Sequence, residues 1–326
     1  MHVFVTGGAG FIGSNLVEHH LAKGDSVHVV DDLSTGRREN IAPYIGNPRF
    51  QFDHADIVNW PGMEKAAAWA DRIYHMAAVV GVFRVLEDPI NVLSTNIAGT
   101  DRLLRAAADG HWKPQIIIPS SSEVYGPISG PILREDATLL VHSGARSRWN
   151  YAISKLADEA QGLSYARQHG LPICIVRLFN TVGPRQTGRY GMVIPRFVEQ
   201  AVTGQPITIF GSGEQTRSFC DVRDTVVALD LLAGAPRAAG EIVNVGNDRE
   251  ISINDLADLI CERAGLPPNR KHLSYVEAYG EEYDDILHRR PSLEKLMSMT
   301  EFQHRWTLED TLDELIADAR TRHGKG

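Results

Sequence analysis

Short runs of apolar and β-branched residues alternate with longer amphipathic segments through the first half of the chain. The runs that we expect to form strands are residues 2–6, 26–31, 49–56, 72–77, 115–120 and 171–179. Segments with helical spacing stand between them, notably residues 11–24, 88–108 and 149–169. Strands that are apolar along their whole length belong to parallel sheets with helices on both faces. The pattern therefore predicts a doubly wound α/β fold.

The pattern changes after Phe179. Proline and glycine recur, and shorter apolar units follow at residues 207–210, 241–245 and 271–277. Since single cores stop growing at about 250 to 300 residues, we expect a large domain at 1–179 and a smaller α/β lobe at 180–326. This lobe closes over the first domain, with some of its segments returning to it. A last helix is expected from Leu308 to about Arg320.

Composition excludes several classes of function. The 326 residues carry a net charge of −8, and basic residues occur only in short pairs such as Arg37–Arg38, which argues against a nucleic-acid or anionic-membrane surface. Three scattered cysteines indicate neither a disulfide framework nor a metal site. With no signal-peptide pattern and no apolar run of about 18 residues, we expect a cytoplasmic protein.

Three glycines, Gly7, Gly10 and Gly13, lie between the first strand and the first helix. There they permit a tight turn and let backbone N–H groups approach a pyrophosphate, which predicts a Rossmann-type dinucleotide site. Asp31 and Asp32 end the second strand, where a carboxylate binds the adenosine ribose and repels a 2′-phosphate. NAD is therefore expected, with NADP left open by Arg37 and Arg38. Asp56 is a candidate for the adenine amino group.

Candidate catalytic groups follow in two segments, SSSEVYG at 120–126 and WNYAISKLADE at 149–159. Tyr151 and Lys155 stand four residues apart, on one face of a predicted helix. An ammonium beside a phenol favours the phenolate, so we expect the pKa of Tyr151 to be lowered toward that of a general base.

From Met1 to about Leu315 the chain resembles the extended short-chain dehydrogenase/reductase family, the NAD-dependent epimerases, dehydratases and decarboxylases of nucleotide sugars. The motifs that carry this resemblance are TGGAGFIGS, DDLSTGRREN, HMAA, TNIAGT, SSSEVYG, YAISK, LFNTVGPRQ and GEQTRSFCDVRD. The resemblance implies an NAD-binding domain at 1–179 and a lobe that mainly binds the nucleotide sugar at 180–326. The cofactor contacts expected besides those above are Phe11, Ile12, Ser34, Thr35, Gly36, Ile57, Met76, Ala77, Ala78, Asn96, Ser120, Tyr151 and Lys155.

The resemblance also implies roles in the reaction. Tyr151 takes the proton from the sugar C4 hydroxyl, Lys155 tunes Tyr151 and holds the nicotinamide ribose, and Ser121 hydrogen-bonds the C4 oxygen while hydride passes to NAD+. Candidate substrate contacts are Asn180, Arg185, Val193, Arg217 and Arg289. A homodimer is expected, paired through the helix after Asp88 and the helix of Tyr151.

Three reactions can follow oxidation at C4. Segments SSSEVYG, RWNYAISK, FNTVGPR and HRRPS resemble those of UDP-glucuronate decarboxylases, in which Ser122, Glu123 and Arg289 fall on positions of the decarboxylation step. A UDP-sugar 4-epimerase, acting on UDP-glucose or UDP-glucuronate, stays open because DDLSTGRREN is more like the hexose 4-epimerases. Arg185 in GPRQ, shared with glucuronate 4-epimerases, is a second candidate for the C6 carboxylate.

A 4,6-dehydratase is disfavoured, because Ser122 stands where one dehydratase type has aspartate, although another type tolerates serine. Ser121 itself replaces the more usual threonine. A non-catalytic NAD-sensing scaffold is the alternative outside the enzymes, and the presence of both Tyr151 and Lys155 argues against it.

Overall fold

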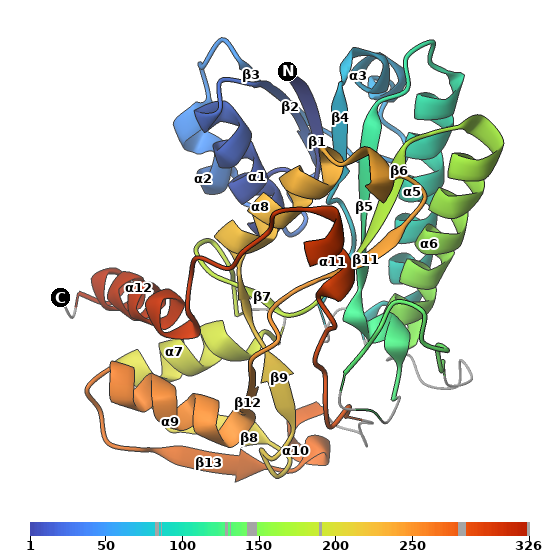
Figure 1. The fold of residues 1–326 in the computed structure, drawn as a ribbon. Helices are drawn as coiled ribbons and strands as arrows, with labels where there is room; N and C mark the ends of the chain where they lie inside the picture. The colour runs from blue at the N-terminus through green and yellow to red at the C-terminus, as the bar shows by residue number, and fades with distance from the viewer. Residues whose placement is uncertain are drawn as a thin grey trace.

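The computed structural model describes residues 1–81, 85, 87–127, 130, 132–141, 149–188, 191–279 and 285–324. Within this part of the chain, the large sheet has seven strands, all paired in parallel, in the order β11, β6, β5, β4, β1, β2, β3 (Figure 1). They are β1 (His2–Thr6), β2 (Ser26–Asp31), β3 (Phe50–His54), β4 (Arg72–His75), β5 (Gln115–Ser121), β6 (Ile173–Leu178) and β11 (Ile242–Val245).

Both faces of this sheet are covered, as the apolar strands require. Val3 and Val5 pack on one face and Phe4 between them packs on the other, following the two-residue period of a strand. The helices on the first face are α1 (Phe11–Ala22), α8 (Val222–Ala233) and α11 (Glu294–Met299), and those on the second are α3 (Met63–Trp69), α5 (Pro89–Asp109) and α6 (Asn150–His169). The predicted doubly wound fold is confirmed.

The remaining elements form a smaller layer below the sheet in Figure 1, around a core of their own that includes Phe197, Ile209, Leu256 and Leu312. Its helices are α7 (Val193–Thr203), α9 (Ile253–Arg263), α10 (Tyr275–Tyr279) and α12 (Leu308–Arg322). Its strand pairs are β7 (Thr181–Val182) with β10 (Cys220–Asp221), β8 (Ile207–Phe210) with β13 (Arg270–Leu273), and β9 (Thr216–Ser218) with β12 (Glu250–Ser252).

One segment lies elsewhere than its neighbours in sequence suggest. Residues 241–245 belong by their spacing with the short units of the lobe, yet β11 extends the large sheet beside β6. Ile242 and Val243 of this strand pack on opposite faces of the large sheet. The chain from α8 to β11 therefore packs with the large sheet, although its residue numbers lie within the predicted lobe.

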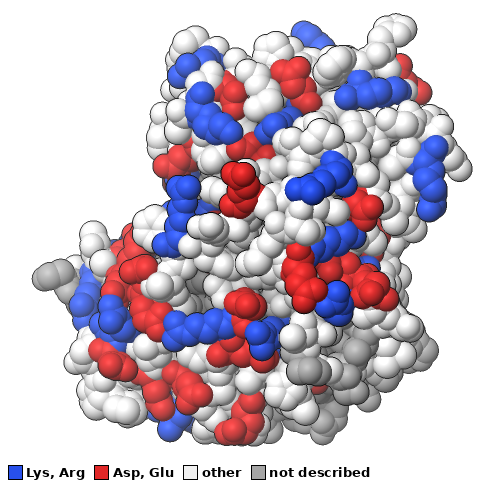
Figure 2. Space-filling model, viewed as in Figure 1, with Lys and Arg blue, Asp and Glu red and all other residues white. Residues whose placement is uncertain are grey.

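The strand order reverses between β1 and β4, and crevices that bind ligands in such sheets lie at the carboxyl ends of the strands at this point. The short 3-10 helix η2 (Ser122–Tyr125) continues from β5 at the same end. On the face drawn in Figure 2, Lys and Arg side chains are interspersed with Asp and Glu. Among the described residues, no helix has both the length and the apolar character that crossing a membrane requires.

Candidate active site

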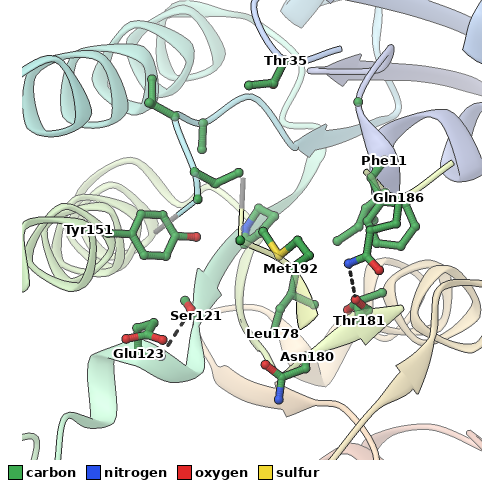
Figure 3. A pocket seen from close by; sticks show the side chains of 18 of the residues that line it. Phe11, Thr35, Ser121, Glu123, Tyr151, Leu178, Asn180, Thr181, Gln186 and Met192 are labelled. Atoms are coloured by element: carbon green, nitrogen blue, oxygen red, sulfur yellow. Dashed lines mark hydrogen bonds between the residues drawn. The ribbon is translucent and has the colours of Figure 1, made fainter. Parts of the chain in front are cut away.

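A cavity of about 520 Å³ opens at the carboxyl ends of the strands, between the large sheet and the smaller layer. Figure 3 shows Phe11 and Thr35 on one side of it, with Tyr151, Ser121 and Glu123 on the other. Nearly all the residues expected at the cofactor and the substrate line this cavity, and the exceptions are Gly36, Asn96 and Arg185.

The glycine-rich turn leaves the N-terminus of α1 open to the cavity. Gly7 has a φ of 69°, and a Cβ there would lie 2.6 Å from the backbone nitrogen of Ala77, while a Cβ at Gly13 would collide with the Gly7 carbonyl. Gly10, the N-cap of α1, offers no side-chain cap to the first helical N–H groups. Those groups and the helix dipole fit a pyrophosphate.

Asp31 fastens the loop after β2 to this turn. Its carboxylate accepts hydrogen bonds from the backbone N–H groups of Ala9 (2.9 Å) and Leu33 (2.8 Å). Burial raises the pKa of Asp31, against the effect of these two hydrogen bonds. Gly36 lies behind the carboxylate, where a Cβ would come 2.7 Å from Oδ1, so it shapes the loop without lining the cavity.

The adenine end has the other expected residues. Asp32, Ser34, Thr35, Asp56 and Ile57 line it, but both Asp56 oxygens already accept hydrogen bonds, from the Val58 N–H and the Asn59 side chain, each at 3.0 Å. Arg37 donates to Thr187 at 3.5 Å and does not line the cavity. Arg37, which would favour the 2′-phosphate of NADP, is therefore directed away from the cavity.

Tyr151 and Lys155 share one face of α6, and both line the cavity. Burial raises the pKa of Tyr151, outweighing Lys155 and a hydrogen bond with Ser121, which lower it. The net lowering that the sequence suggested is therefore wrong, because spacing alone does not reveal how deeply the phenol is buried. When bound, oxidised nicotinamide adds a positive charge and accepts or returns a hydride.

The hydroxyls at the end of β5 face different partners. The Ser121 Oγ accepts a hydrogen bond from the Glu123 N–H at 3.2 Å (Figure 3). The Ser120 hydroxyl donates instead to Glu159 at 2.6 Å, and Glu159 is held by two hydrogen bonds from Arg177. Ser120 thus lines the cavity with its hydroxyl committed to a buried ion pair, while Ser122 is buried at its edge.

Two buried arginines, Arg289 and Arg217, line the cavity close enough for their charges to interact. Arg289 donates from Nη1 to Glu123 Oε1 at 2.7 Å, and only 6% of its side chain is exposed. Arg217 pairs with Asp285 at 2.6 Å, and Tyr275 donates to the second oxygen of this carboxylate. Burial, followed by the charge of Arg289, lowers the pKa of Arg217. A diphosphate or carboxylate would relieve this repulsion.

Besides Gly36, two predicted contacts lie outside the cavity lining. Arg185 forms an ion pair with Glu18 of α1, so the structure does not bring it to the substrate. Asn96 accepts from the Val79 N–H at 2.7 Å and donates to Ser154, so it supports the loop after β4 from behind. Asn180 and Val193 do line the cavity, and Asn180 donates to the Ser218 carbonyl at 3.1 Å.

Sequence reasoning missed several residues of the smaller layer that line the cavity: Arg196, Phe210, Gln215, Tyr275 and Asp285. The Arg196 guanidinium lies 4.1 Å from the centre of the Phe210 ring. Gln215 stands within the motif GEQTRSF and Phe210 just before it, but no motif in the sequence marked Arg196, Tyr275 or Asp285. Within the described residues no cluster of His, Cys, Asp or Glu is suited to a metal ion.

A glycine-rich dinucleotide turn that shares one cavity with a tyrosine and lysine on a single helix face defines a nucleotide-dependent oxidoreductase site. The model of the NAD dependent epimerase/dehydratase family matches residues 3–246, and the chain belongs to this family. It is therefore an enzyme with NAD as its cofactor, as the sequence predicted.

Relatives that are named as decarboxylases agree with this assignment. The chain is 36% identical to the UDP-N-acetyl-alpha-D-glucosaminuronate decarboxylase of Bacillus cytotoxicus, over 96% of this chain and 95% of that protein. It is 34% identical to UDP-glucuronic acid decarboxylase 4 of Arabidopsis thaliana, over 99% of this chain and 69% of that one.

Solved structures of the same fold include the UDP-glucuronic acid 4-epimerase of Bacillus cereus in complex with UDP-glucuronic acid and NAD. It has a TM-score of 0.86 and 29% identity, and the match covers 99% of this chain and 100% of that chain. The dTDP-glucose 4,6-dehydratase DesIV of Streptomyces venezuelae has a TM-score of 0.89 and 28% identity, with 99% and 98% covered.

Proposed function

We propose that the protein decarboxylates a UDP-hexuronate, UDP-glucuronate in the first instance, through a 4-keto intermediate. The observation that carries the proposal is the buried Arg289 beside Glu123 in the cavity of Tyr151. Arg289 lines the cavity, and a guanidinium has five N–H donors, so the bond from Nη1 to Glu123 leaves other donors for a substrate carboxylate or ketone. The names of the two decarboxylase relatives point to the same reaction.

In this mechanism Tyr151 takes the proton of the C4 hydroxyl while hydride leaves C4. Lys155 keeps a positive charge beside the phenolate, and Ser121 holds the C4 oxygen by a hydrogen bond. The resulting β-keto acid loses CO2, and the electron pair of the broken C5–C6 bond moves into the C4 ketone as an enolate. Arg289 stabilises that negative charge.

Completion of the reaction needs a proton at C5 and hydride at C4. Glu123, with Ser122 beside it, lies at the end of β5 and pairs with Arg289, and 23% of its side chain is exposed. We assign proton delivery to C5 to this glutamate, which takes the proton from solvent water. Tyr151 then returns its proton to the C4 oxygen. The product is a UDP-pentose.

Two features of the smaller layer support a UDP-sugar substrate. Arg217 in β9 and Asn180 just before β7 line the cavity, and we expect the diphosphate of such a substrate to lie beside them. Val193 lines the same wall of the cavity from the start of α7. We assign diphosphate binding to Arg217, because its pairing with Asp285 holds the guanidinium in the cavity wall.

The second candidate is a UDP-glucuronate 4-epimerase. The fold similarity to the Bacillus cereus enzyme favours it, because that enzyme was solved with the same uronate. An epimerase turns the 4-ketosugar over and returns hydride without losing CO2, so it gives Glu123 no proton to deliver to C5. A 4,6-dehydratase, the activity of DesIV, remains the third candidate.

The test is to incubate the protein with NAD+ and, separately, with UDP-glucuronate, UDP-N-acetylglucosaminuronate and UDP-glucose. Mass spectrometry of the product distinguishes loss of CO2, loss of water and unchanged mass, and NMR of the unchanged material detects a C4 epimer. We expect loss of CO2 from one of the uronates. A product of unchanged mass with inverted C4 would establish the epimerase instead.

We also propose that two copies pair through α5 and α6. These helices pack against each other, and Ile90 at the start of α5 is 79% exposed. Apolar side chains on an outward helix face are typical of an interface. Sedimentation of the protein and of its Ile90→Lys variant tests this, because the charge would destabilise a dimer that buries this position and leave a monomer unaffected.

A further inference from the structure

A third ionisable side chain continues the face of α6 that carries the catalytic pair. Asp158 follows Lys155 by three residues, and its Oδ2 lies 3.1 Å from the Lys155 Nζ. The Asp158 side chain is 1% exposed and the Lys155 side chain 4%. Tyr151, Lys155 and Asp158 therefore form one buried row, because residues three and four apart face the same side of a helix.

A buried histidine at the end of the sheet lies near this row, where the charge of Lys155 acts on it. His75 at the end of β4 contacts the Thr6 hydroxyl at 2.8 Å through Nδ1 and the Thr100 hydroxyl at 3.1 Å through Nε2. Burial, assisted by the charge of Lys155, lowers the pKa of His75 to about 3. His75 is therefore neutral near pH 7 and does not compete with Lys155 for the carboxylate. Burial raises the pKa of Asp158, against the effects of Lys155 and Thr100, which lower it.

We infer that Asp158 is a positioning residue that fixes the Lys155 ammonium beside Tyr151. A lysine side chain has four rotatable bonds, and a buried ammonium without a partner is costly. The short contact with Asp158 removes both problems, because it satisfies the charge and restricts the chain. This inference rests on the proposed C4 oxidation, for which Tyr151 and Lys155 act together, but it does not depend on which sugar is oxidised.

The carboxylate also determines the pH range in which the pair works. A negative charge favours the protonated form of every group near it, so Asp158 raises the pKa of both Tyr151 and Lys155. The other charged groups facing this pair are Glu123 from η2 and Glu159 from α6, and Glu159 is already neutralised by Arg177.

Asp158→Asn removes the charge and keeps the shape. We expect both limbs of the pH profile of NADH formation in a single turnover to move to lower pH, by roughly half a unit to one unit. We also expect kcat to fall by roughly tenfold, because Lys155 loses its orientation, with KM little changed. Asp158→Glu restores the charge and should return both limbs toward the wild-type positions.

The matched control is Asp101→Asn. Asp101 bridges α5 and α6 through Tyr165 at 3.3 Å, and it pairs with Arg105 outside the cavity. Its pH profile should equal that of the wild type. Limbs that stay in place in a folded Asp158→Asn variant would reduce Asp158 to a packing residue and overturn the inference; Asp158→Ser serves if the Asn variant does not fold.

A second readout separates this inference from the proposed function. Ultraviolet titration of the protein, minus that of Tyr151→Phe, follows the Tyr151 phenolate without any substrate. We expect its pKa to be lower in Asp158→Asn than in the wild type. If no UDP-sugar is oxidised but this shift is found, the proposed function fails and the role of Asp158 stands; an unshifted titration contradicts the role of Asp158 alone.

Discussion

Arg289 and Glu123 are 166 positions apart in the chain and form an ion pair of 2.7 Å at the edge of the cavity. Neither residue has this partner in its own neighbourhood of the sequence. The pair joins the end of β5 in the large sheet to the loop that precedes α11. An acid–base group and a fixed guanidinium are thereby placed together where the sugar C5 and C6 are expected.

Glu123→Gln should separate C4 oxidation from completion of the reaction. The amide keeps the volume of the carboxylate but delivers no proton to C5, so the steady-state rates of UDP-pentose formation and CO2 release should fall by roughly 10²-fold or more. NADH formation in a single turnover should persist, because Tyr151 and Lys155 are intact. The measurement is headspace CO2 together with absorbance of NADH. Equal CO2 release by variant and wild type would remove Glu123 from the mechanism.

Arg289→Lys should impair uronates selectively. Lysine keeps the charge but lacks the planar donor fork that matches a carboxylate. We expect kcat/KM for UDP-glucuronate to fall by roughly 10-fold to 100-fold, with NAD binding unchanged. Arg290→Lys is the matched control, because the Arg290 side chain is 37% exposed and approaches Asp248 only at 3.9 Å. An equal loss in both variants would contradict the assignment to Arg289.

Gly10→Ala and Gly13→Ala should have different effects. A Cβ at Gly10 meets only the Gly7 carbonyl oxygen, at 3.2 Å, so the fold should accept it. The methyl group nevertheless stands where a pyrophosphate approaches the backbone, and NAD binding should weaken by roughly tenfold or more. Gly13→Ala collides with the turn and should cost roughly 1–3 kcal/mol of stability. Calorimetric titration with NAD and chemical unfolding measure the two effects.

Glu159→Gln should lower the free energy of unfolding without removing a substrate contact, because Glu159 does not line the cavity. Glu159 and Arg177 are both nearly fully buried, and removal of one partner of a buried pair costs roughly 3–5 kcal/mol. The control is Glu309→Gln, which breaks an equally bidentate pair with Arg249 at the surface. That change should cost less than about 1 kcal/mol. Urea unfolding compares them, and similar losses would contradict the role of burial.

Stability should depend on pH through His75. The pKa of this residue falls from 6.5 to about 3 on folding, so below pH 6.5 the unfolded chain binds a proton that the folded protein excludes. The folded protein therefore keeps its full stability above pH 6.5 and loses unfolding free energy as the pH falls toward 3. The loss due to His75 is roughly 2 kcal/mol at pH 5. His75→Gln should show a smaller drop in unfolding free energy between pH 7 and pH 5 than the wild type. Equal drops would mean that His75 titrates normally.

The parallel sheet was predictable because its strands are apolar on both faces and its helices amphipathic, and both properties are periodic in the sequence. The glycine-rich turn was predictable for a similar reason, since Gly7, Gly10 and Gly13 act within seven residues. The place of β11 in the large sheet was not predictable, because its pairing with β6 depends on residues more than sixty positions away.

The sequence by itself determined the row of Tyr151, Lys155 and Asp158 on α6, since helical spacing decides which side chains share a face. Only the tertiary structure decided the pKa of Tyr151 and the ion-pair partners of the arginines around the cavity. Burial raises the pKa of Tyr151 despite Lys155, Arg185 turns to Glu18, and Arg289 turns to Glu123. Desolvation and ion pairing arise from groups brought together by folding, so neither depends on spacing along the chain.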